Sequence, residues 1–122
     1  MYTISKKFHF SASHILEALP EDHQCARLHG HNYIVEVVLQ SEELNEYAFV
    51  VDYGDLKPLK KYLDEQLDHR HLNDILPFHT TAENIAKHLF EFCNNIWKET
   101  VAVKVSETPK TWAIYSQKNY LL

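Results

Sequence analysis

Several short stretches of the chain alternate apolar and polar residues, and this period of two is typical of β-strands. Three stretches show it, over 2–10, 101–106 and 112–116. The first alternates Ile4, Phe8 and Phe10 with polar residues. A fourth stretch, 31–40, carries apolar side chains on both parities, which predicts a strand with two buried faces.

Two longer stretches repeat their apolar residues every three to four positions, which predicts amphipathic helices. Over 55–67 the apolar stripe consists of Leu56, Leu59, Leu63 and Leu67, with Pro58 in the first turn. Over 81–97 the stripe consists of Ile85, Leu89, Phe92 and Ile96. Thr80 and Glu83 fit a capping box at the start of this second helix. The order ββααββ predicts an α+β fold, in which two helices cover one face of a four-stranded antiparallel sheet.

The predicted sheet has one face that the two helices cannot cover. Because strand 31–40 is apolar on both faces, its second face needs another cover. The chain has no linker or repeat, and we treat 1–122 as one domain with no further element to supply that cover. We therefore expect a homo-oligomer in which sheets of several subunits join, which also removes exposed strand edges.

Composition narrows the class of protein. A chain of 122 residues and 14.4 kDa has the size of one domain, and 45% apolar with 24% charged residues is typical of a soluble globular protein. A net charge of −5 without a basic run argues against a nucleic-acid or membrane-surface binder. No apolar run approaches the ~18 residues of a membrane span. With two cysteines and no signal-peptide pattern, we expect a cytoplasmic protein without disulfides.

The excess of histidine, nine residues in all, points to metal or acid–base chemistry. His29 and His31 flank Gly30, and side chains two residues apart on an extended chain point to the same side. Two such imidazoles make half of a zinc site, and a catalytic zinc takes a third protein ligand and leaves a position open. The candidates for the third ligand are His9, His14 and His23.

The two cysteines differ in their surroundings. Cys25 lies four residues before His29, and it could either complete a closed zinc site or act off the metal as a base or nucleophile. Spacing alone leaves both interpretations open. Cys93 follows Leu89 by one helical turn, so we expect it in the core.

A second group of polar residues follows the first predicted helix. Asp68 beside His69 suits acid–base chemistry, because a carboxylate can orient an imidazole, but a polar helix end gives the same pattern. His71 lies two residues further on and could take the role of His69. Glu107 ends a predicted strand and, by its pattern alone, is typical of a solvated carboxylate.

Six short motifs in order make the chain resemble the 6-pyruvoyl-tetrahydropterin synthase family, and within it the 6-carboxytetrahydropterin synthase branch. They are Phe10-Ser11-Ala12-Ser13-His14, Cys25-x3-His29-Gly30-His31, Val51-Asp52-Tyr53, Leu67-Asp68-His69, Thr80-Thr81-Ala82-Glu83-Asn84 and Glu107-Thr108-Pro109. The three-residue gap before the His-Gly-His motif is similar to that of the carboxy branch, since the pyruvoyl branch typically has a longer gap.

The resemblance implies a tunnelling fold (T-fold), in which subunits assemble into a barrel, as a trimer or a dimer of trimers, with sites at the interfaces. It implies a Zn²⁺ ion held by His14, His29 and His31. It implies that Cys25 is the catalytic base and that His69, oriented by Asp68, is the second proton-transfer group. Glu107 would anchor the pterin, and the segment at Thr80 and Thr81 would line its pocket.

The implied substrate is 7,8-dihydroneopterin triphosphate. In the carboxy branch the products are 6-carboxy-5,6,7,8-tetrahydropterin, acetaldehyde and triphosphate, in the 7-deazaguanine route to queuosine. Two alternatives are a 6-pyruvoyl-tetrahydropterin synthase, which eliminates triphosphate but keeps the carbon chain, and a non-catalytic zinc-stabilised binding module.

Only two of the twelve basic residues are arginine, and both lie inside these motifs. Because the planar guanidinium binds phosphate oxygens in pairs, Arg27 and Arg70 are candidates to neutralise the triphosphate. The alternative is that each pairs with a nearby carboxylate, such as Asp22 or Asp74.

Overall fold

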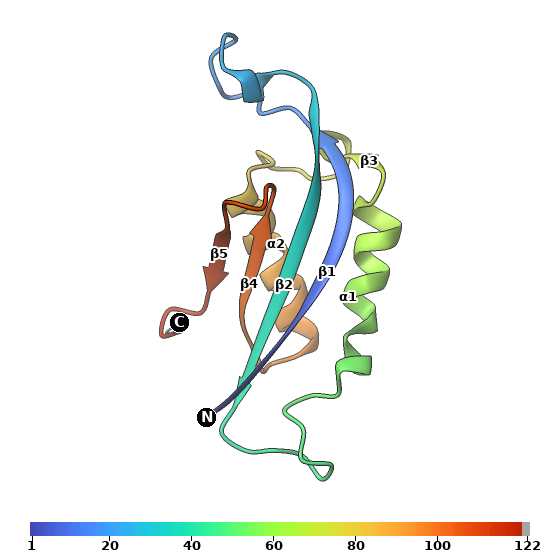
Figure 1. Cartoon of the computed structure of the whole chain (residues 1–122), viewed down its shortest axis with the longest axis vertical. Coiled ribbons are helices and arrows are strands. Elements are labelled where there is room, and N and C mark those ends of the chain that lie inside the picture. Colours follow the sequence, from blue (N-terminus) through green and yellow to red (C-terminus); the bar gives the residue numbers. More distant parts are fainter. Residues whose placement is uncertain (121–122) are drawn as a thin grey trace.

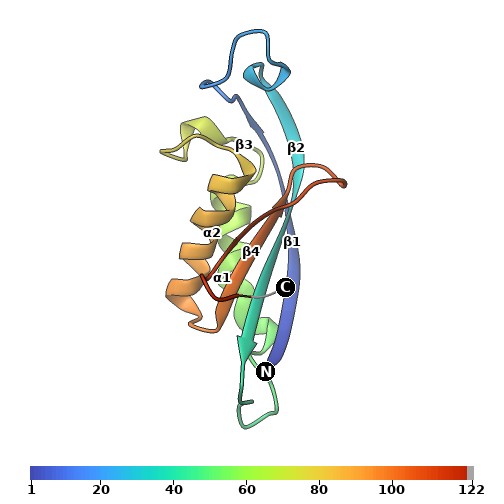
Figure 2. The ribbon, with the colours of Figure 1, turned by 90° about the vertical axis from the view of Figure 1, so that its left-hand side faces the viewer.

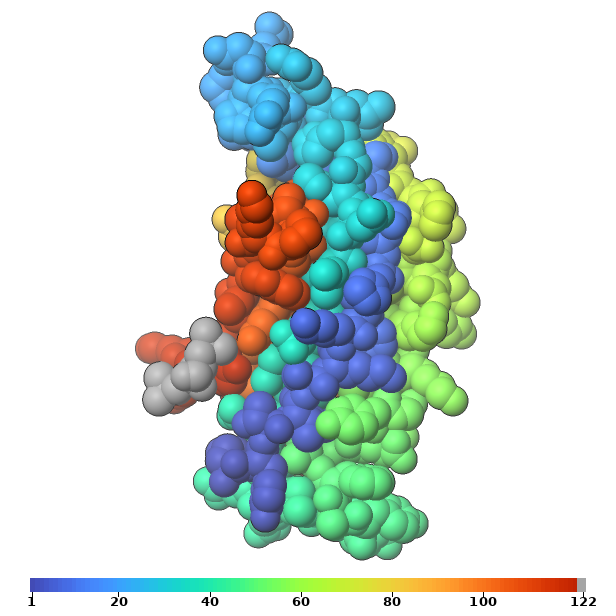
Figure 3. Space-filling model, in the orientation of Figure 1, coloured from blue at the N-terminus to red at the C-terminus, as the bar shows by residue number. Residues whose placement is uncertain are grey.

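The computed structural model describes residues 1–120 as a five-stranded sheet with two helices on one face (Figure 1). The strands are β1 (Tyr2–His14), β2 (His29–Ser41), β3 (Arg70–His71), β4 (Thr100–Ser106) and β5 (Ala113–Ser116). The helices are α1 (Lys57–Tyr62) and α2 (Ala82–Ile96). Figure 2 shows both helices on the same side of the sheet, and Figure 3 shows the face that they leave uncovered.

The strand order is β3-β1-β2-β4-β5, so the prediction of a four-stranded, wholly antiparallel sheet was wrong by one strand. The added strand, β3, pairs in parallel with Ala12 and Ser13 near the end of β1. It has only two residues, too few for any alternation to appear in the sequence. The other three pairings are antiparallel as expected.

The segment predicted as the first helix consists of three consecutive types of helix. A 3₁₀ turn, η2 (Tyr53–Leu56), leads into α1, and a π-helical turn, η3 (Leu63–Leu67), follows it. The leucine stripe is confirmed, because Leu56, Leu59, Leu63 and Leu67 are all fully buried. Pro58 lies in the first turn of α1, where its missing N–H costs little.

The start of α2 differs from the predicted capping box by one residue. The N-cap is Thr81, whose hydroxyl accepts a hydrogen bond from the Asn84 N–H at 3.2 Å. Thr80 is therefore not the cap, and its buried side chain lies next to His14 instead. Ile96, expected in the stripe, is 46% exposed near the end of the helix, whereas Cys93 is buried in the core as predicted.

The core lies between the sheet and the two helices. Tyr33 on β2 stacks on Phe10 of β1 with ring centroids 4.6 Å apart, and both rings are buried. On the opposite face of β2, Val38 is 3% exposed but Ile34 is only half-buried, so part of that face remains accessible in one chain. No helix among residues 1–120 is long and apolar enough to cross a membrane.

Candidate metal centre

Three histidines lie close together where β1 ends and its partner strand β2 begins. The antiparallel register places His14 directly opposite His29, while His31 lies opposite Ala12 on the same face of the sheet. The strands approach closely here, because a Cβ atom on Gly30 would lie only 3.2 Å from the Ala12 carbonyl oxygen. Glycine between the two histidines therefore permits the strand pairing that brings the three imidazoles together.

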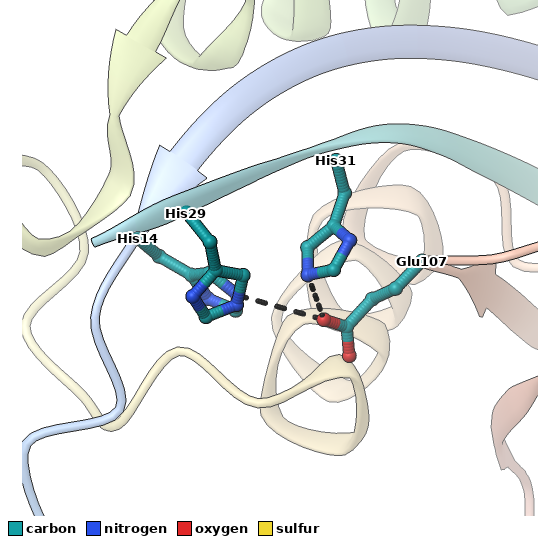
Figure 4. Close-up of side chains that lie close together, drawn as sticks. All are labelled: His14, His29, His31 and Glu107. Carbon is teal, nitrogen blue, oxygen red and sulfur yellow. Dashed lines mark ion pairs between the residues drawn. The ribbon is translucent and has the colours of Figure 1, made fainter. Parts of the chain in front are cut away.

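Glu107, directly after β4, completes the cluster (Figure 4). One ligand atom from each of His14, His29, His31 and Glu107 lies within 4.8 Å of all the others. The three imidazole rings are arranged edge-to-face, with centroids 4.5 to 5.2 Å apart. Nitrogen and carboxylate donors at this spacing suit a transition metal such as zinc.

Backbone carbonyl groups orient two of the imidazoles. His14 Nδ1 lies 2.9 Å from the Thr80 carbonyl oxygen and 3.1 Å from the Thr80 hydroxyl, and His29 Nδ1 lies 2.7 Å from the Arg27 carbonyl oxygen. A carbonyl only accepts hydrogen bonds, so each Nδ1 carries a proton, and in the neutral tautomer each Nε2 presents a lone pair to the centre. This arrangement is the usual support for metal-binding histidines.

The Nε2 atoms themselves lack hydrogen-bond partners. Glu107 Oε2 lies 2.8 Å from His31 Nε2 and 3.5 Å from His14 Nε2. Neither contact is aligned as a hydrogen bond, and the Nε2 atoms of all three histidines are buried without a partner among the described residues. Buried lone pairs that converge on one point are costly unless an ion binds them, so the cluster fits a metal centre.

Burial and the neighbouring groups shift the pKa values of His31 and Glu107 at this centre. Burial lowers the pKa of His31, although the Glu107 carboxylate opposes this shift. The His14 imidazole, with smaller effects of His31 and His29, holds the pKa of Glu107 below its ordinary value. Tyr33 lies edge-on to His14 and His31, and its buried hydroxyl also lacks a hydrogen-bond partner among the described residues. Burial raises the pKa of Tyr33, so this hydroxyl stays protonated.

The other two candidates for the third ligand lie elsewhere. His23 caps the 3₁₀ turn η1 (Gln24–Ala26), where its Nδ1 accepts the Cys25 N–H at 3.0 Å. His9 is exposed on β1, between two inward-facing phenylalanines. Cys25 is half-buried in η1 and does not belong to the cluster of metal-ligating groups. The fourth group of that cluster is Glu107, which the sequence pattern alone had indicated to be solvated.

Asp68 and His69 form a second polar site after η3. Asp68 Oδ2 lies 2.8 Å from His69 Nδ1, and Asp68 Oδ1 accepts the Ser11 N–H at 2.8 Å. The Ser11 N–H and then the His69 imidazole lower the pKa of Asp68, so its carboxylate is charged near neutrality. His71 instead lies 2.9 Å from the Ser13 hydroxyl through its Nδ1. Of the two imidazoles, His69 is thus the one with a carboxylate partner.

Neither arginine pairs with a carboxylate among residues 1–120, so the alternative, a pairing with a nearby carboxylate such as Asp22 or Asp74, is not observed there. Arg70 instead donates from Nε and Nη2 to the Glu65 carbonyl oxygen, at 3.2 and 2.9 Å. Arg27 is exposed. Thr80, expected to line a ligand pocket, contacts His14, and Thr81 caps α2.

Comparison with known proteins places the chain in a family. The sequence profile of 6-pyruvoyl tetrahydropterin synthase matches residues 3–118. The 6-carboxy-5,6,7,8-tetrahydropterin synthase of Haemophilus influenzae is 28% identical, over 96% of this chain and all of that protein. A putative 6-carboxy-5,6,7,8-tetrahydropterin synthase of Archaeoglobus fulgidus is 33% identical, over 85% of this chain and 86% of that protein.

A solved structure agrees. The 6-pyruvoyl tetrahydropterin synthase of Caenorhabditis elegans superposes with a TM-score of 0.84 at 28% identity, covering 96% of each chain. The fold is thus that of these synthases, as the motifs had led us to expect. The chain belongs to the 6-pyruvoyl tetrahydropterin synthase family.

Proposed function

We propose that this protein is a zinc-dependent 6-carboxy-5,6,7,8-tetrahydropterin synthase. It would convert 7,8-dihydroneopterin triphosphate into 6-carboxytetrahydropterin and release acetaldehyde and triphosphate. The observation that carries the proposal is the convergence, in a chain of this family, of three buried Nε2 atoms without a hydrogen-bond partner among residues 1–120. The names of several relatives, all at modest identity, favour the carboxy product over the pyruvoyl product.

His14, His29 and His31 would hold the zinc through Nε2. Three protein nitrogens leave one position for a water molecule or the substrate, as in other catalytic zinc sites. A zinc ion there supplies Lewis-acid polarisation of a side-chain hydroxyl of the substrate. Thr80 and the Arg27 carbonyl keep the imidazoles of His14 and His29 in the tautomer that binds metal.

Glu107 would anchor the pterin at the mouth of the centre. Its carboxylate is 23% exposed, and it lines a cavity of about 410 Å³ together with His31, Ser106, Thr108 and Pro109. An ionised carboxylate can accept two parallel hydrogen bonds, from the amino group and a ring N–H of a pterin. The low pKa of Glu107 supports this role, because it keeps both oxygens as acceptors.

Cys25 would remove a proton from the substrate, and His69 would return one, with Asp68 holding His69 Nδ1. No hydrogen bond joins Cys25 to His69 in residues 1–120, and the His69 side chain is 83% exposed. We propose that a homo-oligomer brings these groups around one substrate at subunit interfaces. The face of β2 opposite the core is partly accessible in one chain, at Ile34, and this supports such an assembly.

The test is to incubate the zinc-loaded protein with 7,8-dihydroneopterin triphosphate and identify the pterin product by mass. The proposal expects 6-carboxytetrahydropterin with stoichiometric acetaldehyde. A 6-pyruvoyl product without acetaldehyde would instead assign the activity named for the Caenorhabditis elegans structure. No turnover by protein that holds one zinc per chain would contradict both activities.

A further inference from the structure

The segment from Asp68 to Asn73 is attached along the end of β1. The His69 N–H donates to the Ser11 carbonyl at 2.6 Å, and the Asp68 carboxylate accepts the Ser11 N–H at 2.8 Å. Strand β3 then pairs with Ala12 and Ser13. The strand that ends at the metal-centre residue His14 therefore also holds the segment that carries His69.

Asn73 closes this attachment at its far end. Its Oδ1 accepts the Ile15 N–H at 2.9 Å, and its Nδ2 donates to the Ile15 carbonyl at 2.8 Å. Ile15 directly follows His14. The side-chain amide of Asn73 therefore binds both the N–H and the carbonyl oxygen of the residue next to the metal centre. Replacing either half of the amide removes one of the two bonds, since oxygen only accepts and nitrogen only donates.

His69 itself has a backbone conformation that needs such support. Its φ angle is 59°, in the left-handed region that residues other than glycine seldom adopt. A conformation of this kind persists only where surrounding contacts hold it, and it is frequent at functional sites. Arg70, directly after His69, donates to the Glu65 carbonyl oxygen within η3. Asn73, four residues after His69, binds the segment to Ile15.

We propose that Asn73 is a positioning residue that fixes His69 relative to the metal centre. The inference rests on the proposed function only for the part of its test that measures turnover. Loss of the amide donor frees the end of the segment, so His69 relaxes from its left-handed conformation and its imidazole moves away from the reacting atoms. The metal centre stays intact, because strand register and Thr80 hold His14 independently.

The experiment compares Asn73→Asp with Asn45→Asp. Asn45 lies in the connection between β2 and η2, and its Oδ1 accepts the N–H groups of Tyr47 and Phe49 at 2.9 and 3.1 Å. Aspartate at position 45 keeps both of those bonds, whereas aspartate at position 73 loses the donor to Ile15. The two variants add the same charge, so they differ in the lost hydrogen bond. Asn73→Ala, which removes both bonds, is measured in parallel.

Three readouts are taken on the zinc-loaded protein: hydrogen exchange of the His69 amide, zinc per chain, and kcat and KM. For Asn73→Asp we expect His69 exchange at least ~10-fold faster, unchanged zinc, and kcat lower by roughly 10- to 100-fold with KM nearly constant. Asn73→Ala should show the larger effect, and Asn45→Asp should match the wild type in all three.

Wild-type exchange and kcat in both Asn73 variants would overturn the proposal. Zinc loss in proportion to activity would also overturn it, since Asn73 would then support the metal centre. The same holds if both Asn73 variants fail to fold while Asn45→Asp folds, because the role would be structural. If the wild type makes no pterin product, the proposed function fails, and the exchange measurement still decides whether Asn73 holds His69.

Discussion

The candidate metal centre and the proposed proton-transfer groups are built in opposite ways. The three histidines of the candidate metal centre come from two paired strands, and His14, which ends β1, is fully buried with its Nδ1 2.9 Å from the Thr80 carbonyl oxygen. Cys25 lies in a 3₁₀ turn and His69 on an exposed loop, with no hydrogen bond between them in residues 1–120. One chain thus brings the three histidines together through strand pairing, whereas we propose that Cys25 and His69 need a second subunit to meet around one substrate.

The largest effect should come from removing a histidine of the metal centre. His29→Ala leaves two nitrogen donors, too few to retain zinc in an open site, so both zinc and turnover should be lost. Metal analysis per chain and product formation measure this. His9→Ala is the control, because His9 lies outside the cluster and should keep its zinc. A full zinc complement in His29→Ala would show that strand register does not build the centre.

Cys25→Ala should show that zinc binding and turnover depend on different residues. Zinc should stay bound, because the thiol lies outside the cluster, while kcat should fall by at least ~100-fold, as for other positioned acid–base groups. The matched control is Cys93→Ala, which removes a buried thiol from the core. It should lower the free energy of unfolding by about 1 kcal/mol and leave kcat unchanged. Equal kcat values in the two variants would remove Cys25 from the mechanism.

Replacing each arginine by glutamine sharpens the comparison further. Arg70, the residue after His69, binds the Glu65 carbonyl oxygen, so Arg70→Gln should weaken the binding of 7,8-dihydroneopterin triphosphate and of dephosphorylated dihydroneopterin alike. Arg27→Gln should weaken only the triphosphate, by about tenfold, if its exposed guanidinium contacts phosphate. Binding of both compounds is measured by calorimetry. Equal losses for the two compounds in Arg27→Gln would exclude that contact.

The smallest effect concerns the helix layer, far from both regions. His88 on α2 forms a hydrogen bond with the Tyr62 hydroxyl through Nε2 at 2.6 Å, and burial lowers the pKa of His88 despite the nearby Glu91. Protons then bind the unfolded chain more tightly, so the free energy of unfolding should fall as the pH drops below about 6.5. In urea unfolding at pH 7.5 and 5.5, His88→Phe should show a smaller difference than the wild type. An unchanged difference would contradict this assignment.

The sequence predicted the elements that depend on a local pattern of apolar and polar residues. Alternation located β1, β4 and β5, and the leucine stripe located the first helix, because these periodicities reflect a single buried face. A run of apolar residues on both parities located β2. The motif histidines could be grouped because His29 and His31 lie on one strand. The resemblance, not the spacing, selected His14 from three candidates.

Features that depend on contacts between distant segments could not be predicted from the sequence. The two residues of β3 are a strand only because β1 lies beside them. Thr80 and Thr81 are adjacent and alike, and only the path of the chain decides that one supports His14 and the other caps α2. Asn73 gives no signal beyond its place after a leucine, since its partner Ile15 lies 58 residues away.

The central claim is that three histidines hold zinc while Cys25 stays off the metal. X-ray absorption at the zinc edge of the loaded protein tests it most directly, because sulfur and nitrogen ligands differ in distance and scattering. We predict three imidazole nitrogens at about 2.0–2.1 Å from the zinc, with an oxygen as the fourth ligand. A sulfur ligand at about 2.3 Å would place Cys25 on the metal, and would favour a closed structural site over a catalytic one.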